Sequence, residues 1–347
     1  MAGLGRMGAV HAANVARRCP SAELVGVFDP RPEVAQSLAA ELGVVATGTY
    51  DDLLGNCPVD GVIIASPTAA HAELARRAAQ AGKHVFCEKP ISLHRDVTVE
   101  VVRALGEAGV KLQVGFHRRF DASCAAAAER ARAGELGDVY LFRASQRDKV
   151  PPKPEFLAGS GGIFVDMAIH DLDLARWFVG DVATVNAHGA ALSDPRLAEI
   201  GDFDSVAVVL SFVTGALGVL DVSRVAGYGY DSSVEVMGSK ATVRVDEPFL
   251  YGYEWRSAGV ASRPLVQTFD RRYLAAFTAE IEHFARSVLD DTTPAVTGSD
   301  ALAAFDLARA AERACRLGQA VSVTPTGEPA LARRGLPAGP PVAPEAR

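Results

Sequence analysis

The sequence predicts an α/β domain with a parallel sheet, followed by an α+β domain with a large, mostly antiparallel open sheet. Up to Val114, short β-branched segments alternate with Ala-rich amphipathic segments, which is the pattern of repeated βα units. From Val139 onward the strand-like segments are longer and follow one another without helices between them. The length of 347 residues allows two separate cores. We expect the first domain over residues 1–115, the second over 116–325, and a flexible Pro- and Gly-rich tail over 326–347.

The first domain alternates strands and helices after its N-terminal turn. The strands are expected at residues 23–28, 59–65, 84–88 and 111–114, and the helices at 33–42, 71–81 and 97–108. Two parallel strands joined through a helix almost always connect with a right-handed crossover. The sheet is therefore expected to be parallel, with helices on its faces.

The second domain is expected to hold strands at residues 139–147, 183–191, 205–212, 215–224, 233–237 and 242–245, with two helices near its end at 271–289 and 300–316. An open sheet leaves one face without a covering layer of helices. The residues predicted for that face are Val206, Val208, Leu210, Leu217, Val219 and Asp221. A largely apolar sheet face usually contacts another subunit, so we expect a homodimer or a homotetramer.

Composition and charge exclude several classes of function. A net charge of −7 and a pI near 5.7 leave no basic surface for a phosphate backbone, so no nucleic-acid partner is expected. The sequence shows neither a secretory leader nor an apolar run that could span a bilayer, which predicts a cytoplasmic protein without a membrane partner. The five cysteines are far apart and form no C-x-x-C pair, so neither a metal site nor a disulfide framework is expected.

A glycine motif near the N-terminus indicates a dinucleotide-binding site. Gly3, Gly5 and Gly8 form G-x-G-x-x-G ahead of a helical segment over 11–18, where backbone amides can approach a pyrophosphate without a Cβ in the way. Asp29 ends the following strand, where a carboxylate accepts hydrogen bonds from the ribose hydroxyls of NAD and repels the 2′-phosphate of NADP. Arg31 could accept that phosphate, so NADP is retained as the less favoured cofactor. The first domain is therefore predicted to have the Rossmann fold and to bind NAD.

The start of the chain is unusual for this motif, because a strand of about five residues ordinarily precedes it. Met1 lies only two residues before Gly3. Loss of this central strand would expose backbone groups of its neighbours and unseat the glycine loop. We therefore expect that the natural protein has residues upstream of Met1.

Three residues suggest acid–base chemistry. Lys89 lies between Glu88 and Pro90 at the carboxyl end of a predicted strand, where ligands bind in an open α/β sheet. Asp166 and His170 are four residues apart at the start of a predicted helix, so they share one helix face. A carboxylate in that position can hold the imidazole in one tautomer and tune its pKa for proton transfer. Taken singly, these residues are more often a solvated lysine, a capping aspartate and a core histidine.

Together these motifs resemble the Gfo/Idh/MocA oxidoreductase family over nearly the whole chain. The residues that carry the resemblance are the run Gly3, Leu4, Gly5, Arg6, Met7 and Gly8, then Ser66, Pro67 and Thr68 with His71, then Glu88, Lys89 and Pro90, and then Asp166 with His170. The resemblance implies that His170 accepts the alcohol proton, Asp166 orients the imidazole and Lys89 stabilises the alkoxide, although Lys89 or His170 could be the formal base. It also implies a cofactor site formed by Gly3, Gly5, Arg6, Met7, Gly8, Asp29, Ser66, Pro67, His71 and Glu88.

Within this family the sequence resembles the inositol 2-dehydrogenases, in residues 115–121, 146–148, 161–171 and 228–231. This resemblance implies NAD-dependent oxidation of a secondary alcohol of myo-inositol or scyllo-inositol, with His117, Arg118, Asp148 and Tyr228 as substrate contacts. His117 stands where the family often has an amide or a thioether, so the preferred ring or epimer can differ. A dehydrogenase or reductase of another sugar is the alternative. A non-catalytic NAD-binding regulator is disfavoured, because it need not keep the lysine, the aspartate and the histidine together.

Overall fold

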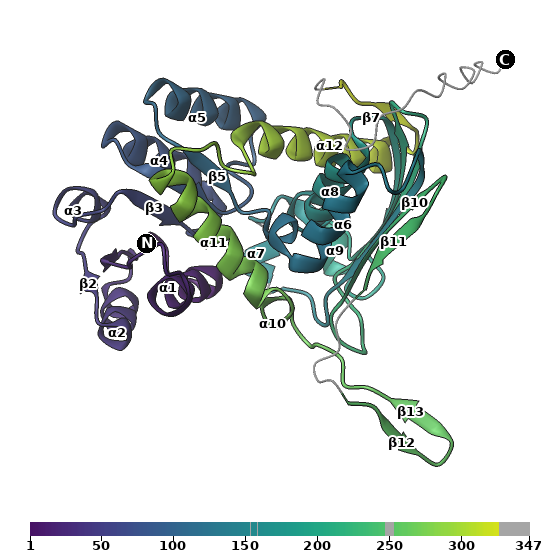
Figure 1. The fold of residues 1–347 in the computed structure, drawn as a ribbon, viewed down its shortest axis with the longest axis horizontal. Helices are drawn as coiled ribbons and strands as arrows, with labels where there is room; N and C mark the ends of the chain where they lie inside the picture. Colours follow the sequence, from purple (N-terminus) through teal and green to yellow (C-terminus); the bar gives the residue numbers. More distant parts are fainter. Residues whose placement is uncertain (153, 158, 247–252, 326–347) are drawn as a thin grey trace. The chain divides into compact units, whose positions relative to one another are not determined.

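Figure 1 shows the fold in a computed structural model, which describes residues 1–152, 154–157, 159–246 and 253–325. The chain forms two compact units, each assembled from three stretches of sequence. The first unit comprises Met1–Ala122, Pro152–Asp166 and Thr268–Asp306, and the second comprises Ser123–Pro151, Met167–Gln267 and Leu307–Arg347. These units interleave along the chain, whereas the predicted division into 1–115 and 116–325 is sequential. The predicted tail, 326–347, lies outside the described residues.

The first unit contains the predicted parallel sheet. Its strands are β1 (Gly26–Val27), β2 (Val45–Ala46), β3 (Gly61–Ile64), β4 (His84–Cys87) and β5 (Leu112–Val114). β1 pairs with β2, and β3, β4 and β5 pair in that order, all in parallel. Ala2 joins the two groups, because it forms parallel bridges with both Phe28 and Ile64. The order β2, β1, Ala2, β3, β4, β5 is that of a Rossmann fold, as the glycine motif predicts.

Met1 and Ala2 supply the backbone contacts of the central strand. Phe28 N donates to the Met1 carbonyl oxygen at 2.9 Å. Ala2 N donates to Ile63 O at 2.8 Å, and Gly3 N donates to Phe28 O at 2.9 Å. These bonds hold the glycine loop in place although only two residues precede Gly3. The expected residues upstream of Met1 stay a prediction.

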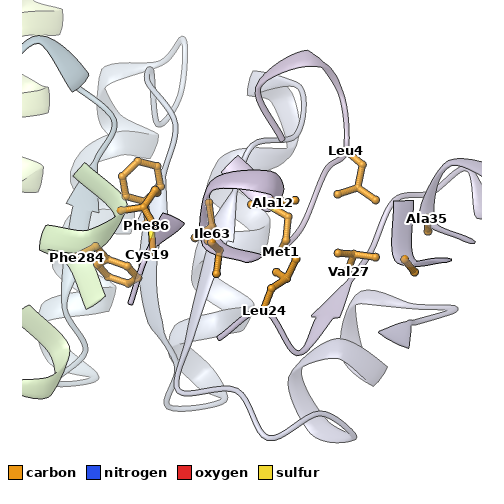
Figure 2. Close-up of a cluster of buried hydrophobic side chains, with 13 residues drawn as sticks. Met1, Leu4, Ala12, Cys19, Leu24, Val27, Ala35, Ile63, Phe86 and Phe284 are labelled. Carbon is orange, nitrogen blue, oxygen red and sulfur yellow. The ribbon is translucent and has the colours of Figure 1, made fainter. Parts of the chain in front are cut away.

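Helices pack around this sheet and complete its core. They are α1 (Arg6–Arg18), α2 (Pro32–Leu42), α3 (Tyr50–Gly55), α4 (Thr68–Gln80), α5 (Arg95–Glu107), the 3-10 turn His117–Phe120, α10 (Phe269–Arg272) and α11 (Leu274–Leu289). α11 comes from far along the sequence, yet its Phe284 joins Phe86 and Val27 in the buried cluster of Figure 2. The predicted helix 271–289 is interrupted, since Tyr273 has non-helical torsion angles and packs its ring 4.6 Å from that of His117.

The second unit is built on the large, mostly antiparallel open sheet that the sequence predicts. Its strands are β6 (Val139–Arg147), β7 (Val182–Ala190), β8 (Ser205–Phe212), β9 (Leu217–Ser223), β10 (Asp231–Gly238), β11 (Thr242–Val245) and β14 (Val321–Ser322). They lie in the order β11, β10, β6, β9, β8, β7, β14, where β6 and β9 are parallel and the other neighbours antiparallel. The edge strand β14 and a separate hairpin of β12 (Trp255–Ser257) and β13 (Val260–Ser262) are additions to the predicted strands.

The remaining helical segments of the chain are α6 (Ala122–Arg132), α7 (Pro154–Leu157), the π-helical turn Phe164–Ala168, α8 (Ile169–Val179), α9 (Arg196–Glu199) and α12 (Gly298–Leu317). In the second unit, α6 and α8 lie on one side of the large sheet (Figure 1). Within the described ranges, no helix combines the length and the hydropathy of a membrane span.

The two faces of the large sheet differ in exposure. Three of the residues predicted for the open face are buried instead, namely Val206, Val208 and Leu210. Their neighbour Val209 is 48% exposed and lies opposite Val219 of β9, which is 42% exposed. The open face therefore contains Val209 and Val219, together with Leu217 at 51% exposure. The prediction for β8 is wrong because apolar residues occupy both of its faces, so the alternation alone does not reveal which face is covered.

Candidate active site

The glycine loop before α1 is tightly packed at two of its three glycines. Gly3 has a φ of +85°, and a Cβ there would lie 2.5 Å from backbone atoms of Ser66. A Cβ on Gly8 would lie 2.0 Å from the carbonyl oxygen of Gly3. Gly5, the residue before α1, has an ordinary φ of −68°, and a Cβ there would meet no atom within 4 Å. The fold therefore requires Gly3 and Gly8, whereas Gly5 leaves the N-terminus of α1 open to close approach, as a dinucleotide phosphate needs.

Asp29 lies beside this loop as a well-bonded anion. Leu4 N donates to its Oδ2 at 2.9 Å, while Arg31 donates to its Oδ1 from the backbone N at 3.0 Å and from Nε at 2.9 Å. Burial alone would raise the pKa of Asp29, but the hydrogen bonds from Arg31 and Leu4 bring it below its ordinary value. The Arg31 side chain remains 57% exposed, so it covers the carboxylate from the solvent side.

Arg6, the first residue of α1, contacts two residues of α10. Its Nη2 donates to Asp270 Oδ1 at 2.7 Å, and its guanidinium lies 4.1 Å from the centroid of the Phe269 ring. Although burial opposes it, the hydrogen bond and the charge of Arg6 hold the pKa of Asp270 below its ordinary value. Met7 is partly buried in the same first turn. Arg6 and Met7 are thus positioned at the open end of α1, and their contact with a cofactor stays a prediction.

His71 links the loops that follow β3 and β4. Its Nε2 lies 2.7 Å from Ser66 O, and its Nδ1 lies 2.8 Å from Pro90 O. Burial lowers the pKa of His71 despite these two carbonyl groups, so the ring is neutral and can donate to only one of them at a time. Pro67 is exposed and Ser66 is partly exposed. His71 therefore holds in place the loop that presents Ser66 and Pro67.

Lys89 and Asp166 meet in the first unit. Lys89 Nζ donates to the backbone carbonyl oxygen of Asp166 at 2.6 Å and lies 3.6 Å from its Oδ1. The two side chains are only 15% and 14% exposed. Asp166 lies in the π-helical turn Phe164–Ala168, so the regular α-helix assumed for its four-residue spacing to His170 begins only at Ile169. An ammonium group sheltered in this way can stabilise negative charge that develops on a neighbouring oxygen.

Three predicted site residues, His170, Asp148 and Tyr228, belong to the second unit. His170 is buried in the first turn of α8. Asp148 follows β6 and is held through its backbone N, which donates to Ser223 O at 2.9 Å. Tyr228 is 51% exposed, and its hydroxyl donates to Asp231 Oδ2 at 2.6 Å. Burial and this hydrogen bond raise the pKa of Tyr228, which remains a neutral phenol. The catalytic and substrate-binding roles of these residues stay predictions.

His117 and Arg118 are buried in the first unit, in the 3-10 turn that follows β5. The His117 ring lies 4.6 Å from the ring of Tyr273 and 4.5 Å from that of Phe277, measured between centroids. Burial, reinforced by the charge of Arg118, lowers the pKa of His117 well below its ordinary value. A neutral imidazole offers one donor and one acceptor, which is what a hydroxyl group pairs with. Their role as substrate contacts stays a prediction.

A buried cluster of ionisable side chains adds a residue that the sequence reasoning missed. His11 Nε2 lies 2.7 Å from Glu88 Oε1, and Glu280 of α11 places a carboxyl oxygen within 4.8 Å of both. The Glu88 side chain is thus turned toward His11 and is 13% exposed, while its predicted cofactor contact stays untested. Glu280 stands in the apolar stripe of α11 between Phe277 and Phe284. A single acid inside such a stripe is the signal that could have revealed it.

Comparison with known proteins assigns both parts of the chain. Residues 1–116 match the model of the oxidoreductase family with the NAD-binding Rossmann fold, and residues 124–244 match the GFO/IDH/MocA C-terminal domain. A scyllo-inositol 2-dehydrogenase (NAD(+)) from Bacillus subtilis is 36% identical over 92% of this chain and 94% of its own length. A myo-inositol 2-dehydrogenase from Thermotoga maritima is 38% identical over 90% of this chain and 94% of its own length. The solved structure of scyllo-inositol dehydrogenase from Lactobacillus casei, with bound NAD(H) and scyllo-inositol, has a TM-score of 0.87 at 31% identity and covers 92% of this chain and 97% of that one.

Proposed function

Since the chain belongs to the Gfo/Idh/MocA family of oxidoreductases and has an NAD-binding Rossmann domain, we propose that it is an NAD-dependent dehydrogenase of a cyclitol. The proposed reaction oxidises one secondary alcohol of myo-inositol or scyllo-inositol to the ketone. The relatives named as inositol dehydrogenases, at 36% and 38% identity, support this substrate class. The observation that carries the enzymatic part is the sheltered contact between Lys89 Nζ and Asp166 at the carboxyl end of β4.

In this proposal Lys89, Asp166 and His170 handle the proton. NAD, when bound, supplies the acceptor for the hydride. His170 accepts the proton of the reacting hydroxyl, and Asp166 orients the imidazole. Lys89 stabilises the oxygen that loses its proton, because its ammonium group is held 2.6 Å from the Asp166 carbonyl oxygen and is largely shielded from water. Lys89 and His170 can exchange the roles of base and stabiliser without changing the net reaction.

We propose that the enzyme prefers NAD to NADP because of the carboxylate of Asp29. An ionised carboxylate at the end of β1 can accept hydrogen bonds from ribose hydroxyls and repels a 2′-phosphate. Arg31 is the residue that could reverse this preference, but its guanidinium already donates to Asp29 at 2.9 Å. The free space around Gly5 supports the proposal that a pyrophosphate binds at the N-terminus of α1.

The substitution Lys89→Met tests the enzymatic part. NADH formation is followed by absorbance with myo-inositol, scyllo-inositol, chiro-inositol, glucose and xylose, and with NAD and NADP in parallel. We expect the wild type to oxidise an inositol with NAD, and Lys89→Met to lose about 10²- to 10³-fold in kcat while still binding NAD. Lys83→Met, just before the opposite end of β4, is the matched control and should keep wild-type turnover. Unchanged turnover in Lys89→Met would contradict the proposed role.

Two other functions are distinguished by the same assay. A dehydrogenase of another sugar would use the same three residues, and it would act on glucose or xylose but on none of the inositols. A non-catalytic NAD-binding regulator would bind NAD equally well in the wild type and in Lys89→Met and would turn over none of the five compounds. The inositol proposal fails in either case, whereas the family assignment does not.

We also propose that the open face of the large sheet mediates a homodimer or homotetramer. Val209 and Val219 lie opposite each other on this face, and Leu217 extends the apolar area along β9. A charged residue in the middle of such an area opposes association because the charge would lose its hydration. We expect Val219→Lys to shift the protein toward the monomer in light scattering. Leu192→Lys, at a 78% exposed position outside the strands, is the control and should leave the mass unchanged.

A further inference from the structure

The cluster of His11, Glu88 and Glu280 is enclosed by apolar side chains of the first unit. His11 and Glu280 have no solvent-exposed surface. The His11 ring lies edge-on to the rings of Phe86 and Phe277, at centroid distances of 5.5 and 5.8 Å. Three elements meet here, since His11 belongs to α1, Glu88 follows β4 and Glu280 belongs to α11. The cluster is therefore a polar site within the core, and one of its members, Glu88, directly precedes Lys89 in the sequence.

One of the two carboxyl groups has to be neutral, because two buried carboxylates this close repel each other and each would need its own partner. Glu88 has such partners in His11 Nε2 at 2.7 Å and in the backbone N of Lys89 at 3.2 Å. Among the described residues, neither carboxyl oxygen of Glu280 has a hydrogen-bond partner. Burial, together with the charge of Glu88, raises the pKa of Glu280 well above its ordinary value. Glu280 is therefore the group that keeps its proton.

The same three residues could in principle ligate a cation, but their geometry favours the proton. The 2.7 Å separation of His11 Nε2 and Glu88 Oε1 is a hydrogen-bond distance, so Nε2 carries the hydrogen that Glu88 accepts. A histidine nitrogen that carries a hydrogen has no lone pair for a metal. His11 Nε2 and Glu88 Oε1 are thus paired with each other, and a carboxyl oxygen of Glu280 lies within 4.8 Å of both residues' ligand atoms.

The position of Glu88 is set from several sides. Gly115 gives it room, since a Cβ at that position would lie 2.9 Å from Glu88 Oε2. α11 is tied to β5, because Gln113 Nε2 donates to the backbone carbonyl oxygen of Glu280 at 2.7 Å. Glu88 in turn accepts from Lys89 N. A displacement of the Glu88 carboxylate would therefore be passed to the backbone of Lys89.

We propose that Glu280 is a positioning residue, whose neutral carboxyl group directs its proton at Glu88 and thereby fixes Glu88 and the backbone of Lys89. This inference rests on the proposed catalytic role of Lys89. Burial would raise the pKa of Glu88, but its hydrogen bond with His11 and the nearby charge of Lys89 bring that pKa below its ordinary value. An ionised Glu280 would repel that carboxylate, whereas a neutral donor holds it without adding a second buried charge.

Three substitutions test this role. Glu280→Gln keeps a neutral donor of the same shape, Glu280→Leu removes the donor, and Glu282→Gln changes an acid on the same helix that lies outside the cluster and accepts from Ser21. The infrared carbonyl stretch of a protonated carboxylic acid reports on Glu280 without any need for turnover. We expect this band near neutral pH in the wild type and in Glu282→Gln, and its loss in Glu280→Gln.

Kinetics then show whether the proton positions Lys89. We expect Glu280→Gln to keep kcat within about threefold and the same pH profile, and Glu280→Leu to lower kcat by about tenfold or more at saturating NAD. If Glu280 were purely structural, its replacement by leucine would lower stability and leave kcat unchanged.

The proposal is overturned if the infrared band is missing in the wild type, if Glu280→Gln is as impaired as Glu280→Leu, or if the purified protein holds a stoichiometric metal that Glu280→Gln releases. Should Glu280→Leu fail to fold, the comparison of the wild type with Glu280→Gln decides. A wild type inactive on all substrates but with the infrared band would reject the dehydrogenase and leave the protonated Glu280 standing.

Discussion

The substitution Gly5→Ala separates what the fold needs from what a bound dinucleotide needs. A Cβ at Gly5 meets no protein atom within 4 Å, and its φ of −68° suits alanine. Without cofactor, the variant should be as stable as the wild type or more stable by about 0.4–1 kcal/mol, because alanine restricts the unfolded chain. A methyl group on this loop nevertheless stands where a pyrophosphate would approach the amides of α1.

The expected loss of affinity follows from the hydrogen bonds involved. A hydrogen bond between a backbone N–H and a charged phosphate contributes about 1.5–3 kcal/mol, so the loss of one such bond weakens NAD binding about 10- to 150-fold. Affinity is measured by calorimetry with NAD, and stability by thermal unfolding without it. Gly106→Ala in α5 is the matched control, since a Cβ there also meets no atom within 4 Å, and it should gain stability without losing affinity.

Opposite changes in stability and affinity are the signature of a ligand-facing glycine. If Gly5→Ala binds NAD as tightly as the wild type, the pyrophosphate does not lie against this residue and the cofactor site has been placed wrongly. A clearly lower unfolding temperature of the variant would mean that the fold itself needs a glycine at this position. That result would contradict the open space found around Gly5.

Three further predictions concern Asp29, Glu280 and Phe86. Asp29→Asn should lower kcat/KM with NAD about tenfold or more and raise the NADP-to-NAD ratio, because a charge-assisted acceptor for the ribose is lost; an unchanged ratio would refute the role of Asp29. Burial and the charge of Glu88 raise the pKa of Glu280, so its contribution to stability is complete below the ordinary glutamate pKa and is lost as the pH rises toward the raised value. Relative to Glu280→Gln, the unfolding free energy of the wild type should therefore fall by about 1.4 kcal/mol per pH unit in that range, as urea titrations at several pH values can show, and parallel pH dependences would rule out a protonated Glu280. Phe86→Ala should cost about 3–5 kcal/mol in urea unfolding, because the Phe86 side chain is fully buried, and a cost below about 1 kcal/mol would mean that this core is loosely packed.

The sequence predicts most of the regular elements because their signals are local. The strands 139–147, 205–212 and 242–245 are found with their predicted bounds, since β-branched runs and turn residues mark both ends. The glycine motif likewise predicts the NAD-binding Rossmann domain, because the turn before the first helix has short-range backbone requirements. Only the family resemblance pairs Lys89 with Asp166, because their direct contact has no local signal in the sequence.

The features that escaped prediction depend on distant parts of the chain. β14 is two residues long and is stabilised by its pairing with β7, so its own sequence carries little preference for a strand. The break at Tyr273 reflects packing against His117, which is remote in sequence. The apolar stripe around Glu280 indicates that this residue is buried, but its neighbours His11 and Glu88 come from distant parts of the chain. Long-range packing determines all three.

The interleaved course of the chain restricts how this protein can be recombined. A cut after residue 116, where the match to the Rossmann model ends, would remove α11 and with it Ile281 and Phe284 from the core that they complete. Phe86, whose side chain is fully buried, would lose the Phe284 ring that lies 6.0 Å from its own. A functional transplant of the cofactor unit must therefore carry Thr268–Asp306 along. An exchange of residues 1–116 alone, as one contiguous gene segment, would leave this core without two of its buried side chains.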